Sequence, residues 1–88
     1  GSAARQPGLM AFVAIAVEPK RSAEVTAALK RMPAIEALHS VSGKADLMAL
    51  VAVANPAGLD QVLDRIGAIP GVIDTESHLI LSTKLERR

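Results

Sequence analysis

Two stretches that contain no polar side chain decide the fold: Leu9-Met-Ala-Phe-Val-Ala-Ile-Ala-Val17 and Leu47-Met-Ala-Leu-Val-Ala-Val-Ala54. Short, continuous apolar runs of this kind are typical of strands that are buried on both faces. Each run is followed at once by a polar residue and a proline, in Glu18-Pro19 and in Asn55-Pro56. Proline fits the first position of a helix, and Asn is a good N-cap. Each run therefore predicts a strand that leads directly into a helix.

The second half of the chain repeats the first at a constant offset of 37 residues. Pro33 aligns with Pro70 in this repeat, just as Pro19 aligns with Pro56. Apolar residues follow the first proline of each half at the spacing of an amphipathic helix, namely Val25, Leu29 and Met32, and then Leu59, Val62, Leu63, Ile66 and Ile69. The mixed polar and apolar stretches 35–42 and 72–83 predict the second strand of each half. The pattern predicts a β-α-β unit that is used twice.

Two such units with right-handed crossovers form a ferredoxin-like βαββαβ sandwich, an α+β fold with a four-stranded antiparallel sheet and two helices on one face. The first and third strands are central in this topology, and here they are apolar on both faces. Two helices cover only one face, so the other face needs a second cover. We expect another copy of the same sheet to provide it, in a homodimer or higher oligomer. The domain is expected at 9–85, after a tag scar and linker remnant at 1–8 and before a C-terminal tail at 86–88.

The composition of the 88 residues disfavours several classes of protein. There is no cysteine, which excludes disulfides, Cys-based zinc sites and thiol chemistry. A net charge of +1 offers no electrostatic attraction for phosphates or an anionic membrane, and Phe12 is the single aromatic residue on which a base could stack. No apolar run is long enough to span a bilayer. We expect a cytoplasmic protein without a cofactor, a catalytic residue or a bound metal.

The turn Ser42-Gly43-Lys44-Ala45-Asp46 is the best candidate for binding chemistry. Its glycine lets a ligand approach backbone N–H groups, which suit a carboxylate, and Asp46 suits an ammonium group. These are the two ends of an α-amino acid, although most turns of this composition only connect strands. Thr75 and Ser77 share one face of the last strand, where they either add hydroxyl contacts or act as ordinary β-formers. His39 and His78 are expected on opposite edge strands, and neither has a neighbour at metal-ligand spacing.

Three segments carry a family resemblance: Met10 to Pro19, Val41-Ser-Gly-Lys-Ala-Asp-Leu47 and Ile69-Pro-Gly-Val-Ile-Asp-Thr-Glu-Ser77. They resemble the patterns Ala-Phe-Val-x-Val-x-Val, Val-Thr-Gly-x-x-Asp-Leu and Leu-Pro-Gly-Val-x-x-Thr-x-Thr/Ser, and Ser42 stands in place of the usual Thr. From Leu9 to Leu85 the chain resembles the C-terminal effector domain of the Lrp/AsnC family, the bacterial and archaeal feast/famine transcription regulators.

The resemblance implies a domain that senses a small molecule, commonly an amino acid, and assembles dimers into tetramers or octamers. It places the ligand between neighbouring dimers, against the turn and the last strand, and so implies the site residues Ser42, Gly43, Lys44, Asp46, Thr75 and Ser77. Gln61, Asp64 and Arg65 on the second helix form no clear motif, which leaves the effector open. Full-length members bind DNA through a separate N-terminal helix-turn-helix. Such a segment is not found here, so the chain is either a stand-alone version or, as Gly1-Ser2 favours, an excised domain.

Two other functions remain open at this point. One is an enzyme of the dimeric α+β-barrel kind, which shares the topology and holds a cavity between helices and sheet. His39 or His78 would have to point into that cavity as a base. The other is a pure assembly module, in which the pocket between dimers is filled by the protein's own side chains.

Overall fold

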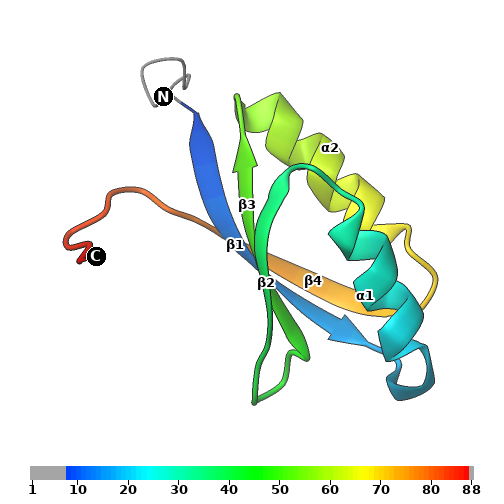
Figure 1. The fold of residues 1–88 in the computed structure, drawn as a ribbon. Coiled ribbons are helices and arrows are strands. Elements are labelled where there is room, and N and C mark those ends of the chain that lie inside the picture. The colour runs from blue at the N-terminus through cyan, green and yellow to red at the C-terminus, as the bar shows by residue number, and fades with distance from the viewer. Residues whose placement is uncertain (1–7, 88) are drawn as a thin grey trace.

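The structure, a computed structural model, describes residues 8–87, so the expected tag scar and linker remnant lies outside the described residues except for Gly8. The four strands form one antiparallel sheet in the order β2-β3-β1-β4, which confirms the predicted ferredoxin-like fold. Along the chain (Figure 1) the elements are β1 (Leu9–Val17), a short 3-10 helix η2 (Pro19–Arg21), α1 (Ser22–Lys30), β2 (Ile35–Ser40), β3 (Leu47–Val53), α2 (Pro56–Gly67) and β4 (Val72–Leu79).

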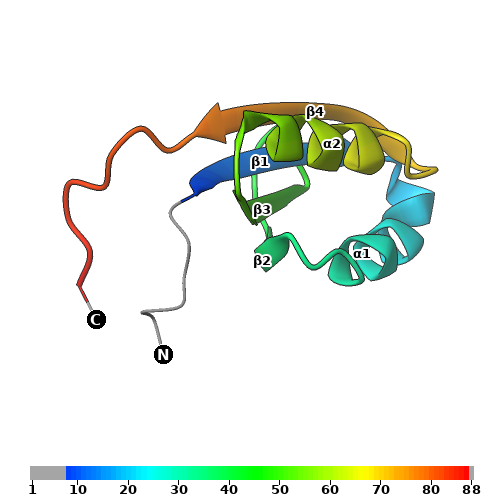
Figure 2. The same cartoon turned by 90° about the horizontal axis from the view of Figure 1, so that it is seen from above.

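The hydrophobic core lies between the sheet and the two helices, which cover the same face (Figure 2). Alternate residues of β1 and β3 are buried on this face, namely Ala11, Val13, Ile15, Val17, Leu47, Ala49 and Val51, while Leu9 and Val53 at the strand ends are only partly buried. They pack with the residues of the predicted helical stripes, of which Val25, Leu29, Met32, Val62 and Ile66 are buried. Met32 and Ile69 contribute to the core from just beyond the helices, because α1 ends at Lys30 and α2 at Gly67. Among the described residues no polar or charged side chain is buried. This layer is therefore a purely apolar core.

The start of α2 has the predicted N-cap and first-position proline, whereas the start of α1 agrees with the prediction only in part. The Asn55 side chain accepts a hydrogen bond of 2.8 Å from the Gly58 backbone N–H, and Pro56 is the first residue of α2. Glu18 makes no such cap, and the chain passes through η2 before α1 begins at Ser22. A glutamate side chain is longer than the Asn, Asp, Ser and Thr side chains that cap well.

Two strands are shorter than the sequence predicted. The stretch 35–42 is a strand only as far as Ser40, and the stretch 72–83 only as far as Leu79. The Ile80 N–H still donates to the Met10 carbonyl at 2.8 Å. Because β1 begins at Leu9, only one residue of β1 precedes Met10, and the chain after Ile80 finds almost no strand residue with which to pair. Residues 80–87 leave the sheet (Figure 1), and we call them the tail.

The face of the sheet that points away from the helices is also apolar in its centre. We call it the free face. Strand register places on it Met10, Phe12, Ala14 and Ala16 of β1, Met48, Leu50 and Ala52 of β3, Ala37 and His39 of β2, and Asp74, Glu76 and His78 of β4. Phe12 is 43% exposed, although it lies in a central strand. The central strands are thus apolar on both faces, as predicted, and the described residues cover only one of them.

The core assignment predicts the effect of truncating a side chain under each helix. Leu29→Ala and Ile66→Ala should each lower the free energy of unfolding by about 2–5 kcal/mol, because both side chains are fully buried and would leave a cavity. Ile73→Ala is the control, since Ile73 is 64% exposed. Chemical denaturation followed by circular dichroism measures all three. A Leu29 or Ile66 variant as stable as the control would refute the assignment.

Gly71 and Gly43 form a matched pair for a second stability test. Both have positive φ, at 102° and 104°. A Cβ atom on Gly71 would lie 2.8 Å from the Arg21 Cβ and 2.9 Å from a Val25 methyl, whereas one on Gly43 would meet nothing within 4 Å. Both Ala variants carry the backbone cost of about 1–2 kcal/mol, and only Gly71→Ala adds a clash. Thermal melts should therefore rank Gly71→Ala clearly below Gly43→Ala, and equal melting temperatures would contradict the packing at Gly71.

Candidate ligand site

The turn between β2 and β3 has the open backbone that the sequence predicted. Gly43 adopts a φ of 104°, and the space where its Cβ would stand is empty to 4 Å. Ser42, Gly43 and Lys44 are exposed to solvent. The turn is closed at its base, where the Val41 N–H donates to the Asp46 carbonyl at 3.1 Å. A ligand can therefore approach the backbone of this turn from outside.

Asp46 ties the turn to the end of β1. Its carboxylate oxygen Oδ2 accepts a hydrogen bond of 2.8 Å from the Val17 N–H. Its own N–H donates to the Ile15 carbonyl at 2.9 Å. Sequence reasoning assigned Asp46 to a ligand ammonium group and missed this internal role, because the partner lies 29 residues away along the chain. Asp46 fixes the position of the turn against the sheet.

A shallow hollow of about 160 Å³ lies beside the turn, on the free-face side of β1 and β4. Its lining residues are Ala14, Ala16, Lys44, Ala45, Asp74, Thr75 and Glu76. Of the six predicted site residues, Lys44 and Thr75 line this hollow, and Ser42, Gly43, Asp46 and Ser77 do not. The two acidic residues were not predicted. The sequence does contain a signal for Asp74 and Glu76, because they alternate with Thr75 and Ser77 along the last strand and must therefore lie on its opposite face.

Thr75 and Ser77 share one face of β4, as predicted, and that face is the helix side of the sheet. Thr75 pairs with Ile15 and Ser77 with Val13, both of which are buried beneath the helices. Asp74 and Glu76 pair instead with Ala16 and Ala14 on the free face. The hydroxyl groups and the carboxylates of β4 therefore point to opposite sides, and the carboxylates are the groups on the side of the hollow.

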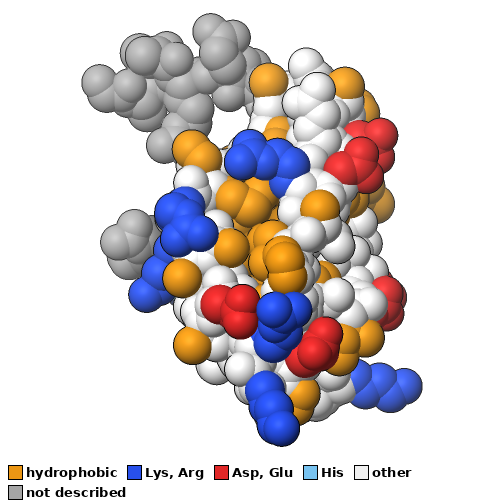
Figure 3. Space-filling model, turned by 90° about the vertical axis from the view of Figure 1, so that its right-hand side faces the viewer, with side chains coloured by type: hydrophobic (Ala, Val, Ile, Leu, Met, Phe, Trp, Pro, Cys, Tyr) orange, Lys and Arg blue, Asp and Glu red, His pale blue; other side chains and the backbone are white. Residues whose placement is uncertain are grey.

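The hollow is lined by residues of opposite charge and by small side chains. Lys44 supplies a cation, and Asp74 and Glu76 supply two anions, while Ala14 and Ala16 leave room between them. A cation suits a carboxylate, and an anion suits an ammonium group, through charge-assisted hydrogen bonds. This arrangement fits the two charged ends of an amino acid. Figure 3 shows the opposite side of the molecule, the side of α1 and α2, where Lys and Arg side chains are interspersed with Asp and Glu.

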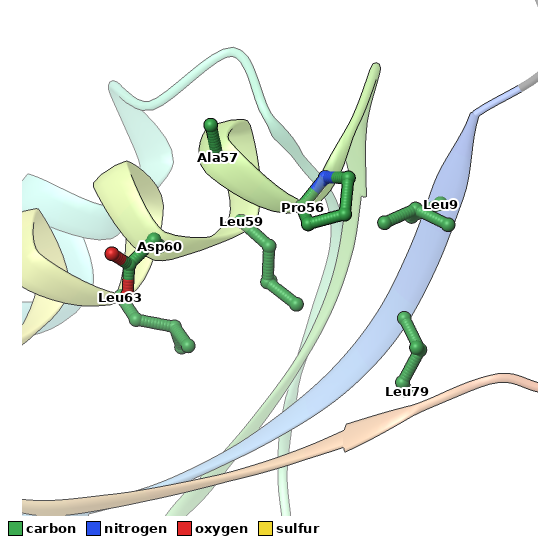
Figure 4. Close-up of a pocket in the computed structure, with 7 residues that line it drawn as sticks. All are labelled: Leu9, Pro56, Ala57, Leu59, Asp60, Leu63 and Leu79. Carbon is green, nitrogen blue, oxygen red and sulfur yellow. The ribbon is translucent and has the colours of Figure 1, made fainter.

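A second hollow, of about 450 Å³, lies where α2 approaches β1 and β4 (Figure 4). Leu59 and Leu63 of α2 project toward Leu9 of β1 and Leu79 of β4. Asp60 is its single charged lining residue. Because it offers no cation for a carboxylate, this hollow suits an amino acid less well than the one beside the turn.

Both histidines lie on the free face, away from the helices. His39 pairs with Met48 and His78 with Phe12, and both are exposed. The His78 Nε2 atom lies 3.8 Å from Glu76 Oε2. The layer between helices and sheet contains no buried polar side chain among residues 8–87. The base that an α+β-barrel enzyme needs in that layer is therefore not supplied by either histidine. Over the same residues, no group of three or more acidic or histidine side chains could hold a metal ion.

Comparison with known proteins agrees with this fold. The family model of the Lrp/AsnC ligand binding domain matches residues 10–88. The HTH-type transcriptional regulator FL11 of Pyrococcus horikoshii is 31% identical over 78 residues, which are 89% of this chain and 52% of FL11. The structure of TTHA0845 from Thermus thermophilus superposes with a TM-score of 0.83 at 30% identity, and the match covers 89% of this chain and 99% of that protein.

A third relative was solved with an amino acid. The feast or famine regulatory protein Rv3291c from M. tuberculosis, complexed with L-methionine, has a TM-score of 0.79 and 34% identity over 91% of this chain and 54% of its own. The chain belongs to the Lrp/AsnC family, and it is a ligand-binding domain of that family. It spans about half the length of the curated relatives it matches, which are named as transcriptional regulators. Among its described helices none is both long and apolar enough to cross a membrane.

The hydrogen bond of Asp46 predicts a loss of stability on mutation. Asp46→Ala should lower the free energy of unfolding by about 1–3 kcal/mol, because the Val17 N–H loses a charged acceptor. Asp46→Asn should lower it less, since an amide oxygen can still accept. Asp60→Ala on the exposed side of α2 is the control. Chemical denaturation measures the series, and an Asp46→Ala variant as stable as Asp60→Ala would show that the bond does not hold the turn.

Proposed function

We propose that this chain is the effector-sensing and oligomerisation domain of an Lrp/AsnC transcription regulator, and that it binds an amino acid or a similar small molecule beside the β2–β3 turn. The observation that carries the proposal is the hollow that Lys44, Asp74 and Glu76 line together with three alanines. The complex of the relative Rv3291c with L-methionine supports an amino acid as the ligand. DNA recognition then belongs to a separate helix-turn-helix, as the names of the HTH-type relatives suggest.

In this proposal the β2–β3 turn binds the carboxylate end of the ligand, and β4 binds its ammonium end. The Gly43 backbone and the Lys44 ammonium group bind the ligand carboxylate, and Ser42 adds a hydroxyl group at the same turn. Asp74 and Glu76 bind the ligand ammonium group. Asp46 acts mainly by holding the turn in place through Val17. The side chains of Thr75 and Ser77 face the helix side of the sheet, so the proposal gives their hydroxyl groups no contact with the ligand.

Assembly is the second part of the proposed function. The free face carries Met10, Phe12, Met48 and Leu50 across the two central strands. A second sheet packed on this face would bury these side chains, as in other two-layer sheet arrangements, and two-fold symmetry lets one surface serve both copies. We propose such a homodimer, which assembles further into a tetramer or octamer. A ligand that binds one assembly better than another shifts the equilibrium toward it, and assembly changes ligand affinity by the same factor.

Thermal melts against a panel of amino acids test the ligand. Circular dichroism is the suitable signal, because the chain has no Trp or Tyr. At a ligand concentration of about one hundred times Kd, the native state gains about 2.7 kcal/mol. For a domain of this size, that gain raises the melting temperature by on the order of 10 °C. We expect one or a few amino acids to do so.

Lys44→Ala and Asp74→Asn should each reduce the ligand-induced shift without lowering the melting temperature of the free protein, since both side chains are exposed. Lys20→Ala, an exposed cation on η2, is the matched control and should keep the full shift. A panel in which no amino acid moves the melting temperature would contradict the ligand part of the proposal and would favour a module that only assembles.

A further inference from the structure

The tail carries apolar side chains that this chain does not bury. After the last sheet bond, from the Ile80 N–H to the Met10 carbonyl, the chain continues without regular structure. Leu81 is 89% exposed and Leu85 is 64% exposed. Leu81 is thus the most exposed of the large hydrophobic side chains among the described residues. Two leucines in a short segment that also contains Ser, Thr and Lys make an amphipathic segment without a partner.

The tail extends away from the sheet at the end of β4 (Figures 1 and 2) and leaves a hollow of about 540 Å³ beside the free face. Met10, Phe12 and Leu50 line the hollow from the sheet. Ile80, Ser82, Thr83, Leu85 and Glu86 line it from the tail. The tail therefore stands off from the free face, and the space between them is large enough for side chains of another chain.

We propose that the tail is an arm that clasps a second copy of this chain. The partner's free face enters the hollow beside Met10, Phe12 and Leu50, and Leu81 and Leu85 pack on the partner. The inference rests on the proposed dimer and goes beyond it, because it adds the tail to the interface and makes the interface incomplete without it.

A second copy fits this surface better than an unrelated partner for two reasons. First, the tail borders the free face directly through the Ile80–Met10 bond, so one contact surface includes both. In a two-fold dimer the apolar free face of each copy then fills the hollow of the other copy. Second, the charges are complementary. The strand residues of the free face include the acids Asp74 and Glu76 and no Lys or Arg, whereas Lys84 and Arg87 outnumber Glu86 in the tail.

The test measures the dimer dissociation constant of the whole chain by sedimentation equilibrium. The double variant Leu81→Asp/Leu85→Asp should raise this constant at least tenfold, because it places charge at two contacts of the arm. Ile73→Asp is the matched control, since Ile73 on β4 is 64% exposed, as Leu85 is, and lies outside the tail. It should leave the constant within twofold of the parent. A double variant that dimerises as tightly as the control overturns the proposal.

Two further variants separate this inference from the proposed dimer. A chain that ends at Ser82 removes Leu85 without adding a charge, and it should also weaken the dimer. Phe12→Asp disrupts the free face itself. If Phe12→Asp dissociates the dimer while both tail variants leave it intact, the arm is refuted and the sheet-face dimer stands. If the parent chain is a monomer at every concentration, both proposals fail. Far-UV circular dichroism verifies that each variant is folded.

Discussion

Strands β1 and β3 are apolar on both faces, and the two helices of this chain cover only one of those faces. On the covered side, small and medium side chains such as Val13, Ile15 and Val51 pack against the helices with no polar group among them. On the other side, Phe12 remains 43% exposed at the centre of the sheet. Exposed apolar surface of this kind is typical of an interaction site. A domain this small also buries a limited share of its surface alone, so the proposed second copy would add stability as well as cover.

The same central strand positions the candidate ligand site. The end of β1 holds Asp46 through the Val17 N–H, and Asp46 in turn holds the β2–β3 turn. Ala14 and Ala16 of β1 form the floor of the hollow that Lys44, Asp74 and Glu76 also line. Because this floor belongs to the free face, the ligand and the partner subunit would contact neighbouring parts of one surface. That proximity gives a physical route for the coupling between effector binding and assembly that the proposed function requires.

The fold was predictable because its signals are local and repeated. The apolar runs, the Asn55 cap and the helical spacing of Leu29 or Ile66 each depend on residues close in sequence. The candidate site was predictable only in part, because the contacts that shape it join distant segments. The turn and its glycine were found from composition, whereas the bond from Asp46 to Val17 and the face occupied by Asp74 depend on strand register. The length of β4 was overestimated because its end is set by where β1 begins, at Leu9.

The dependence of the melting temperature on protein concentration tests the central claim most directly. If the free face is covered by a second copy, unfolding is coupled to dissociation, and the melting temperature must rise as the protein concentration increases. Circular dichroism melts over a hundredfold range of concentration, without ligand, measure this. The account predicts a steady rise across the range. A melting temperature that stays constant would show that a single chain is stable with its apolar sheet face in water, and it would contradict the account.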